Sequence, residues 1–189
     1  MDTALDDLAG WREDRGMGYD LTGLIGAPGT LRPGVATLPD ARVVGLDAGL
    51  ALVPLTGPVL AAVRAADSPE DAGALPGFRQ LTPAVARWAA ALSAAGPVLY
   101  AEAEFFAGSG TQAAIGWRDG QVWFGPLHTR TPDEQREGFA VAAGPGLRGM
   151  AVNAGLRRLG VRAPPAGEPW MDEFWTAGLG RKRSTADWA

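Results

Sequence analysis

The stretch PVLYAEAEFF, residues 97–106, decides the fold, because after its opening proline it reads as one long β-strand. Side chains two positions apart in a strand point to the same face of a sheet. One face therefore carries the apolar set from Leu99 to Phe105, which we expect to face the core. The other face carries Glu102 and Glu104 together, and we expect these two carboxylates to point outward.

Two further strands follow and complete a meander. Residues 112–117 and 121–125 flank Asp119-Gly120, and Asp-Gly between two apolar runs is typical of a hairpin with a two-residue loop. The register implied by such a loop pairs Trp117 with Val122 and Ile115 with Phe124.

The remaining sequence supplies helices for this sheet. Thr56 and Thr82 each stand just before a proline-containing first turn, which is the pattern of an N-cap followed by a helix. This pattern predicts helices over 58–66 and 83–95, each with an apolar face. Other expected elements are short strands at 42–46, 50–55 and 78–81, helices at 147–159 and 170–179, and turns through the Gly- and Pro-rich residues 19–39.

These elements predict an α+β fold, with a central antiparallel sheet of about five strands and helices packed on one face. The 189 residues fit a single domain. Within it, we expect residues 1–18 to form an N-terminal extension. Residues 164–189 are expected to form a C-terminal tail that packs on the body.

Composition narrows the functional classes. The chain is 47% hydrophobic and carries a net charge of -4, which argues against broad binding of nucleic acid or of anionic membranes. It has no cysteine and a single histidine, His128, so thiolate chemistry and zinc sites with paired histidines are excluded. We expect no cofactor and no metal. No signal peptide and no membrane-spanning stretch is recognisable, so the expected location is the cytoplasm.

The two glutamates of the long strand are the first candidates for a functional site. Both could be solvated residues on the wet outer face of the sheet. They could instead bind an ion or a basic group of a partner, or serve acid–base chemistry, because neighbouring carboxylates perturb each other's pKa values. In the catalytic alternative, His128 acts as general base and Glu102 or Glu104 orients it.

A Gly-rich turn follows the strand and extends the candidate surface. Backbone N–H groups of residues 108–111, which include Ser109 and Thr111, could hold an anion, although the lysine of a nucleotide-binding loop is missing. Trp123 alternates away from its apolar neighbours and is a candidate exposed aromatic anchor. The predicted binding residues are Glu102, Glu104, Ser109, Thr111, Gln112 and Trp123.

A resemblance rests on YAEAEFFAGSGTQ at 100–112, followed by WRDG at 117–120. This stretch resembles small bacterial proteins of actinobacterial type, in which a Tyr-x-Glu-x-Glu-aromatic-Phe strand runs into a Gly-x-Gly-x-Gln turn. GYDLTG at 18–23 and GRKRSTADW at 180–188 resemble the ends of such chains. Some of these proteins are similar to immunity proteins of bacterial toxin systems, which bind and block a toxin without catalysis. The resemblance implies a protein partner, such as a toxin, and assigns no catalytic residue.

The sequence therefore supports two functional hypotheses. The first is a non-catalytic, immunity-like protein-binding module that recognises its partner through the acidic strand face and the adjacent turn. The second is a small hydrolase or divalent-ion-binding enzyme that uses Glu102 and Glu104 with His128. The two differ in one geometric requirement, because the enzyme needs His128 within reach of a glutamate in a cleft.

Overall fold

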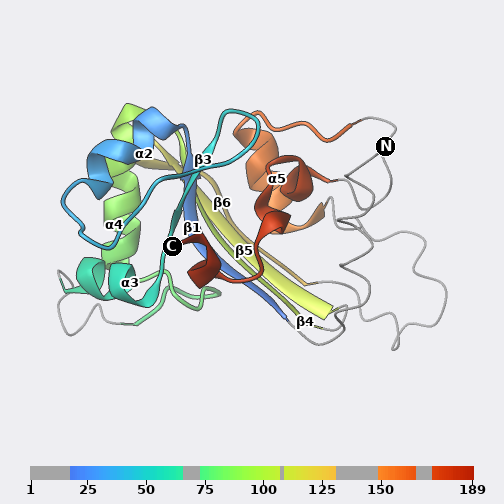
Figure 1. Cartoon of the computed structure of the whole chain (residues 1–189), viewed down its shortest axis with the longest axis horizontal. Helices are drawn as coiled ribbons and strands as arrows, with labels where there is room; N and C mark the ends of the chain where they lie inside the picture. The colour runs from blue at the N-terminus through green and yellow to red at the C-terminus, as the bar shows by residue number, and fades with distance from the viewer. Residues whose placement is uncertain (1–17, 66–72, 107–108, 131–148, 165–171) are drawn as a thin grey trace.

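The computed structural model describes residues 18–65, 73–106, 109–130, 149–164 and 172–189 (Figure 1). Its centre is one antiparallel sheet of six strands in the order β2-β3-β1-β4-β5-β6. The α+β class and the antiparallel sheet are thus confirmed, with one strand more than expected. The strands are β1 (Tyr19–Gly26), β2 (Val44–Gly45), β3 (Ala51–Pro54), β4 (Val98–Phe106), β5 (Ser109–Arg118) and β6 (Gln121–Arg130).

The long strand predicted from the sequence is β4, and its central partner β1 was not foreseen. β1 pairs with β4 along its whole length, from Tyr19 opposite Phe105 to Gly26 opposite Val98. The prediction of turns through 19–39 is wrong for this segment, because its glycines serve close packing. A Cβ at Gly23, for example, would stand 2.4 Å from Leu52 Cδ1 on β3.

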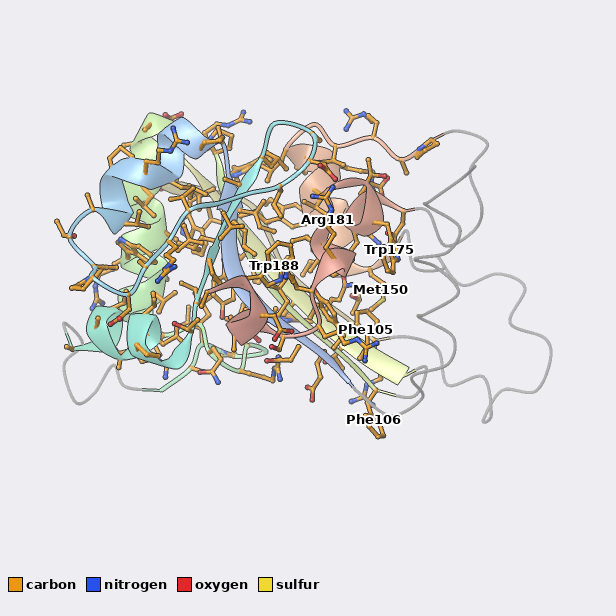
Figure 2. All side chains as sticks on the ribbon, viewed as in Figure 1. Phe105, Phe106, Met150, Trp175, Arg181 and Trp188 are labelled. Atoms are coloured by element: carbon orange, nitrogen blue, oxygen red, sulfur yellow. The ribbon has the colours of Figure 1, made fainter. Side chains whose placement is uncertain are left out.

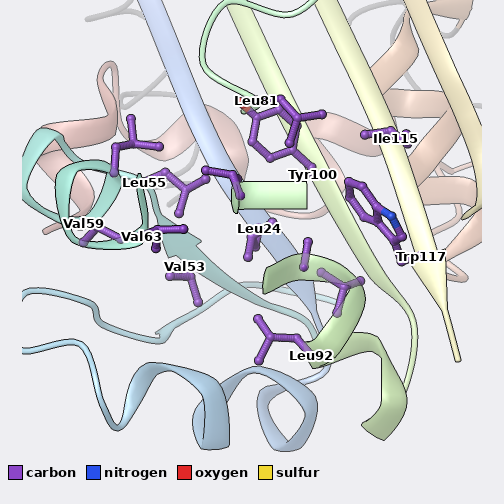
Figure 3. Packing of buried hydrophobic residues seen from close by; sticks show 14 of the residues in the cluster. Leu24, Val53, Leu55, Val59, Val63, Leu81, Leu92, Tyr100, Ile115 and Trp117 are labelled. Atoms are coloured by element: carbon purple, nitrogen blue, oxygen red, sulfur yellow. The ribbon is translucent and has the colours of Figure 1, made fainter. Parts of the chain in front are cut away.

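Three helices cover one face of the sheet: α2 (Pro28–Val35), α3 (Gly57–Arg64) and α4 (Pro83–Leu92) (Figure 1). α3 and α4 are the two helices that the Thr-then-Pro pattern predicts. Thr82 caps α4 through its side chain, which accepts from the backbone N–H of Val85. Figure 3 shows the core beneath these helices, where Leu24, Tyr100 and Trp117 from the sheet meet leucines and valines of the helical layer.

The sequence predicted helices packed on one face, and the structure covers the opposite face as well. α5 (Ala151–Arg158), α6 (Glu173–Thr176) and the short 3-10 turns η5 (Leu179–Arg181) and η6 (Thr185–Trp188) pack there. Both faces of β4 begin with apolar residues, Val98 and Tyr100 on one side and Leu99 and Ala101 on the other. A strand that is apolar on both sides needs a layer on each of them.

The C-terminal segment also completes the edge of β1. β3 pairs with β1 only from Gly23 onward, which leaves the first half of β1 unpaired on that side. There the N–H of Asp20 donates to the carbonyl of Arg183 at 2.8 Å, and the N–H of Thr22 donates to Thr185 Oγ1 at 2.8 Å.

The hairpin between β5 and β6 turns at Asp119-Gly120, as predicted, with positive φ values of 53° and 77°. Trp117 faces Val122, which confirms the register near the turn. Phe124 pairs with Gly116 rather than with Ile115, because irregularities at Gly116 shift the register. Among the described helices, none combines the length and the hydropathy needed to cross a bilayer.

Candidate functional site

The candidate site lies where the helical layer over β4 ends. Along one face of this strand, Tyr100 and Glu102 are buried, whereas the side chain of Glu104 is 54% exposed and Phe106 is 65% exposed. Figure 2 shows Phe106 projecting from the end of the strand, away from the body. The same face is therefore core at one end and open surface at the other.

Glu102 faces the interior, and the expectation that it points outward is wrong. Its Oε2 accepts the backbone N–H of Arg79 at 2.8 Å, and its Oε1 accepts the backbone N–H of Gln80 at 2.7 Å. The hydroxyl of Tyr100 also donates to Oε1. Burial, and then the negative charge of Glu102, raise the pKa of Tyr100 far above its ordinary value. Glu102 thus fastens the segment before α4 onto the sheet.

Arg79 is the residue that gathers the acidic side chains. Its Nη2 lies 2.7 Å from Asp20 Oδ1, and its Nη1 lies 3.0 Å from Glu104 Oε2. Its Nε is 3.8 Å from Glu102 Oε2. Burial alone would lower the pKa of Arg79, but the hydrogen bond to Asp20 and the three carboxylate charges outweigh it and raise that pKa.

Sequence reasoning missed Arg79, because residues 78–81 were read as a brief strand and they form a loop instead. Two glutamates on one strand face do indicate that a cation is near, since like charges in neighbouring positions repel. No spacing rule, however, connects position 79 to glutamates more than twenty residues away. Only the folded chain shows that Arg79 is this cation.

A pocket of about 350 Å³ opens beside this network. Two rows of paired residues form its floor, because Ala113 on β5 pairs with both Glu102 and His128, and Thr111 pairs with both Glu104 and Arg130. The loop before α4 supplies the remaining wall. The lining residues are Gly77, Arg79, Glu102, Thr111, Gln112, Ala113, His128, Thr129 and Arg130.

His128 is held in place by packing. Its ring lies 4.7 Å from the ring of Phe78 at an angle of 71°. Gly77 (φ +83°) passes so close that a Cβ there would stand 2.5 Å from the imidazole. The pocket brings His128 and Glu102 to one cavity, but within the described ranges no hydrogen bond joins the imidazole to either glutamate.

The side chains of two predicted binding residues are engaged elsewhere. Gln112 is buried on the opposite face, where its Oε1 accepts the N–H of Val152 at 2.8 Å at the start of α5. Trp123 is half-buried near the hairpin turn, at the far end of β5 and β6 from Thr111, with the guanidinium of Arg118 at 4.6 Å from its ring centre. Neither side chain joins the recognition surface that the sequence predicted.

Part of the predicted Gly-rich turn belongs to a strand. Ser109, Gly110 and Thr111 belong to β5, paired with Phe106, Phe105 and Glu104, so they do not form the predicted anion-binding loop. The side chain of Ser109 and residues 107–108 lie outside the described part of the chain. Thr111 is exposed and stands beside Glu104 as its register partner.

Within the described residues, no three His, Asp or Glu side chains are grouped so as to hold a metal ion. Comparisons with known protein families, with curated proteins and with solved structures find no match.

Proposed function

We propose that the protein is a non-catalytic protein-binding module, and that its recognition surface is the open end of the sheet. We call this the tip surface and define it by Asp20, Glu104, Phe106 and Thr111. The observation that carries the proposal is Phe106, a large apolar side chain 65% exposed next to two carboxylates that are each about half exposed.

The physical argument is that of an interface hot spot. Exposed aromatic side chains on rigid elements lose little conformational entropy on binding and contribute strongly to affinity. Phe106 extends a strand whose other end is locked in the core. Asp20 and Glu104 each offer oxygens beyond those bonded to Arg79, so they favour a partner with a basic group beside an apolar patch.

The resemblance to immunity proteins of toxin systems supports a toxin as the partner and the cytoplasm as the place of encounter. The net charge of -4 agrees with a protein partner rather than a nucleic acid. Glu102, which the sequence predicted as a binding residue, supports the tip surface from the interior in this proposal and does not contact the partner.

The test uses the purified protein to capture its partner from the native host, followed by calorimetry with the recovered partner. Phe106→Ala and Glu104→Gln should each weaken binding, the first by about 2 kcal/mol or roughly thirtyfold. Val122→Ala is the matched control, because Val122 is also an exposed apolar residue (52%) but lies at the hairpin turn. Equal affinity of all three variants would defeat the proposal.

The second candidate, a small hydrolase or a divalent-ion-binding enzyme, is favoured by one observation: Glu102 and His128 line the same pocket. Against it, both oxygens of Glu102 already accept donors from the protein. Calorimetric titration with Mg²⁺ and Mn²⁺ decides the ion version. Saturable heat that disappears in Glu104→Gln would favour this candidate over the binding module.

A further inference from the structure

The two walls of the pocket differ in how their polar groups are satisfied. On the wall next to β4, Arg79 is engaged by three carboxylates. On the β6 side, the guanidinium of Arg130, the imidazole nitrogens of His128 and the hydroxyl of Thr111 have no hydrogen-bond or ion-pair partner among the described residues. Among the described residues, the pocket side chains without a polar partner therefore belong to β5 and β6.

These three free groups face the same space. Arg130 and His128 are two positions apart on β6, so their side chains lie on one face with backbones about 7 Å apart. Thr111 is the direct register partner of Arg130 on β5, at a separation of about 5 Å between paired residues. All three line the pocket.

The donor set is preorganised at its centre. The side chain of His128 is exposed to an incoming ligand, while contacts with Gly77 and the edge-on ring of Phe78 restrict its imidazole. Arg130 is exposed and has no ion pair with another described residue, and its planar fork of N–H groups matches the two oxygens of a carboxylate or phosphate.

We propose that the pocket binds an oxyanion, a carboxylate or phosphate group, through Arg130, His128 and Thr111. Its volume of about 350 Å³ lies at the lower end of the ~300–1,000 Å³ found for small-molecule sites. The ligand is therefore a small anion or a single anionic group of a larger molecule. This site goes beyond the proposed protein-binding function, because it can be occupied without a protein partner.

The negative charges near the pocket are compatible with an anion. Glu102 lines the pocket from β4, Glu104 lies beside it as the register partner of Thr111, and Arg79 compensates part of their charge. Glu104 stands two strands away from Arg130, which is about 10 Å in a sheet. Its repulsion of an anion at Arg130 is largely screened at that distance, since the Debye length is about 8–10 Å at physiological salt.

His128 provides the readout, because it is the only histidine of the chain and its imidazole proton signals need no assignment. Untagged protein is titrated with inorganic phosphate and, separately, with acetate at constant pH and constant ionic strength. We expect a saturable shift of the His128 signal with at least one of the two probes. Saturation with phosphate alone identifies a phosphate site, and saturation with acetate alone identifies a carboxylate site.

Two variants give the test its specificity. Arg130→Gln should weaken anion binding about tenfold or more, because a charge-assisted hydrogen-bond pair is lost. Arg42→Gln removes the same charge from an exposed position beyond the opposite edge of the sheet and should leave the affinity unchanged. Thr111→Val provides a second variant, with a smaller loss expected and no change of charge.

Three results would overturn the site. A shift that stays linear with both probes shows only a general effect of salt. A saturable shift that Arg130→Gln and Thr111→Val both leave unchanged places the anion elsewhere. An equal loss in Arg42→Gln shows that net charge, and not this pocket, controls binding. None of these results depends on the protein partner, so the proposed function can fail or stand independently.

Discussion

Replacing Glu102 by alanine removes one acceptor group that serves three donors. The backbone N–H groups of Arg79 and Gln80 and the hydroxyl of Tyr100 would lose their partner together. Each buried donor left unpaired costs about 1–3 kcal/mol. Because the two backbone groups are only partly buried and can reach water, we expect a loss of about 3–6 kcal/mol in the free energy of unfolding.

Two further variants serve as comparisons for the stability loss in Glu102→Ala. Glu102→Gln keeps the volume and one acceptor oxygen but turns its NH₂ group toward a donor, so about 2–3 kcal/mol should be lost. Glu104→Ala removes the neighbouring carboxylate on the same strand face, whose side chain is half exposed. Its ion pair with Arg79 should contribute less than about 1 kcal/mol.

The assay is equilibrium unfolding in urea, followed by the fluorescence of the seven tryptophans. Comparison of the midpoints at equal slopes gives the differences in stability. If Glu102→Ala and Glu104→Ala destabilise the protein equally, the buried carboxylate does not fasten the loop to the sheet. The assignment of Glu102 as a structural acceptor would then be refuted.

Three other expectations follow from the same surroundings. The chain has only two tyrosines, Tyr19 and Tyr100, and burial raises the pKa of both above the ordinary value of 10.0. The stability that they contribute is complete below pH 10 and is lost as the pH rises further, so phenolate absorbance should appear only together with unfolding. Phenolate formation in the folded protein near pH 10 would contradict this. Gly77→Ala should lower the free energy of unfolding by about 1–2 kcal/mol, because φ at this position is positive and the new Cβ would displace the imidazole of His128. An unchanged imidazole signal and an unchanged urea midpoint would contradict this. Arg79→Ala should lower the free energy of unfolding by about 1–2 kcal/mol at low salt and by less at high salt, because salt screens the repulsion among the three carboxylates left behind. A loss of stability that does not depend on salt would argue for lost packing instead.

The parts of the fold that the sequence predicted depend on local signals. A few residues of local sequence predict the hairpin at Asp119-Gly120, through its turn residues, and the helix after Thr82, through its N-cap. The alternation along β4 also placed Glu102 and Glu104 correctly on one face. These features need no knowledge of the rest of the chain.

The parts that could not be predicted depend on contacts between distant segments. Glu102 is buried because the loop around Arg79 crosses over it, and nothing in the composition of that loop marks it as a cover. Gln112 is turned inward because the start of α5 needs an acceptor there. β1 resembles a turn locally and becomes a central strand through its pairing with β4. In each case tertiary context overrides local propensity.

The gradient along β4 separates two kinds of evolutionary freedom within one strand. At Tyr100 and Glu102, almost any exchange disturbs hydrogen bonds that hold layers together, so these positions tolerate little variation. Two and four positions farther on, at Glu104 and Phe106, side chains can be exchanged without touching the interior. A library randomised only at these outer positions should keep the fold intact, so new binding surfaces can be selected on an unchanged scaffold.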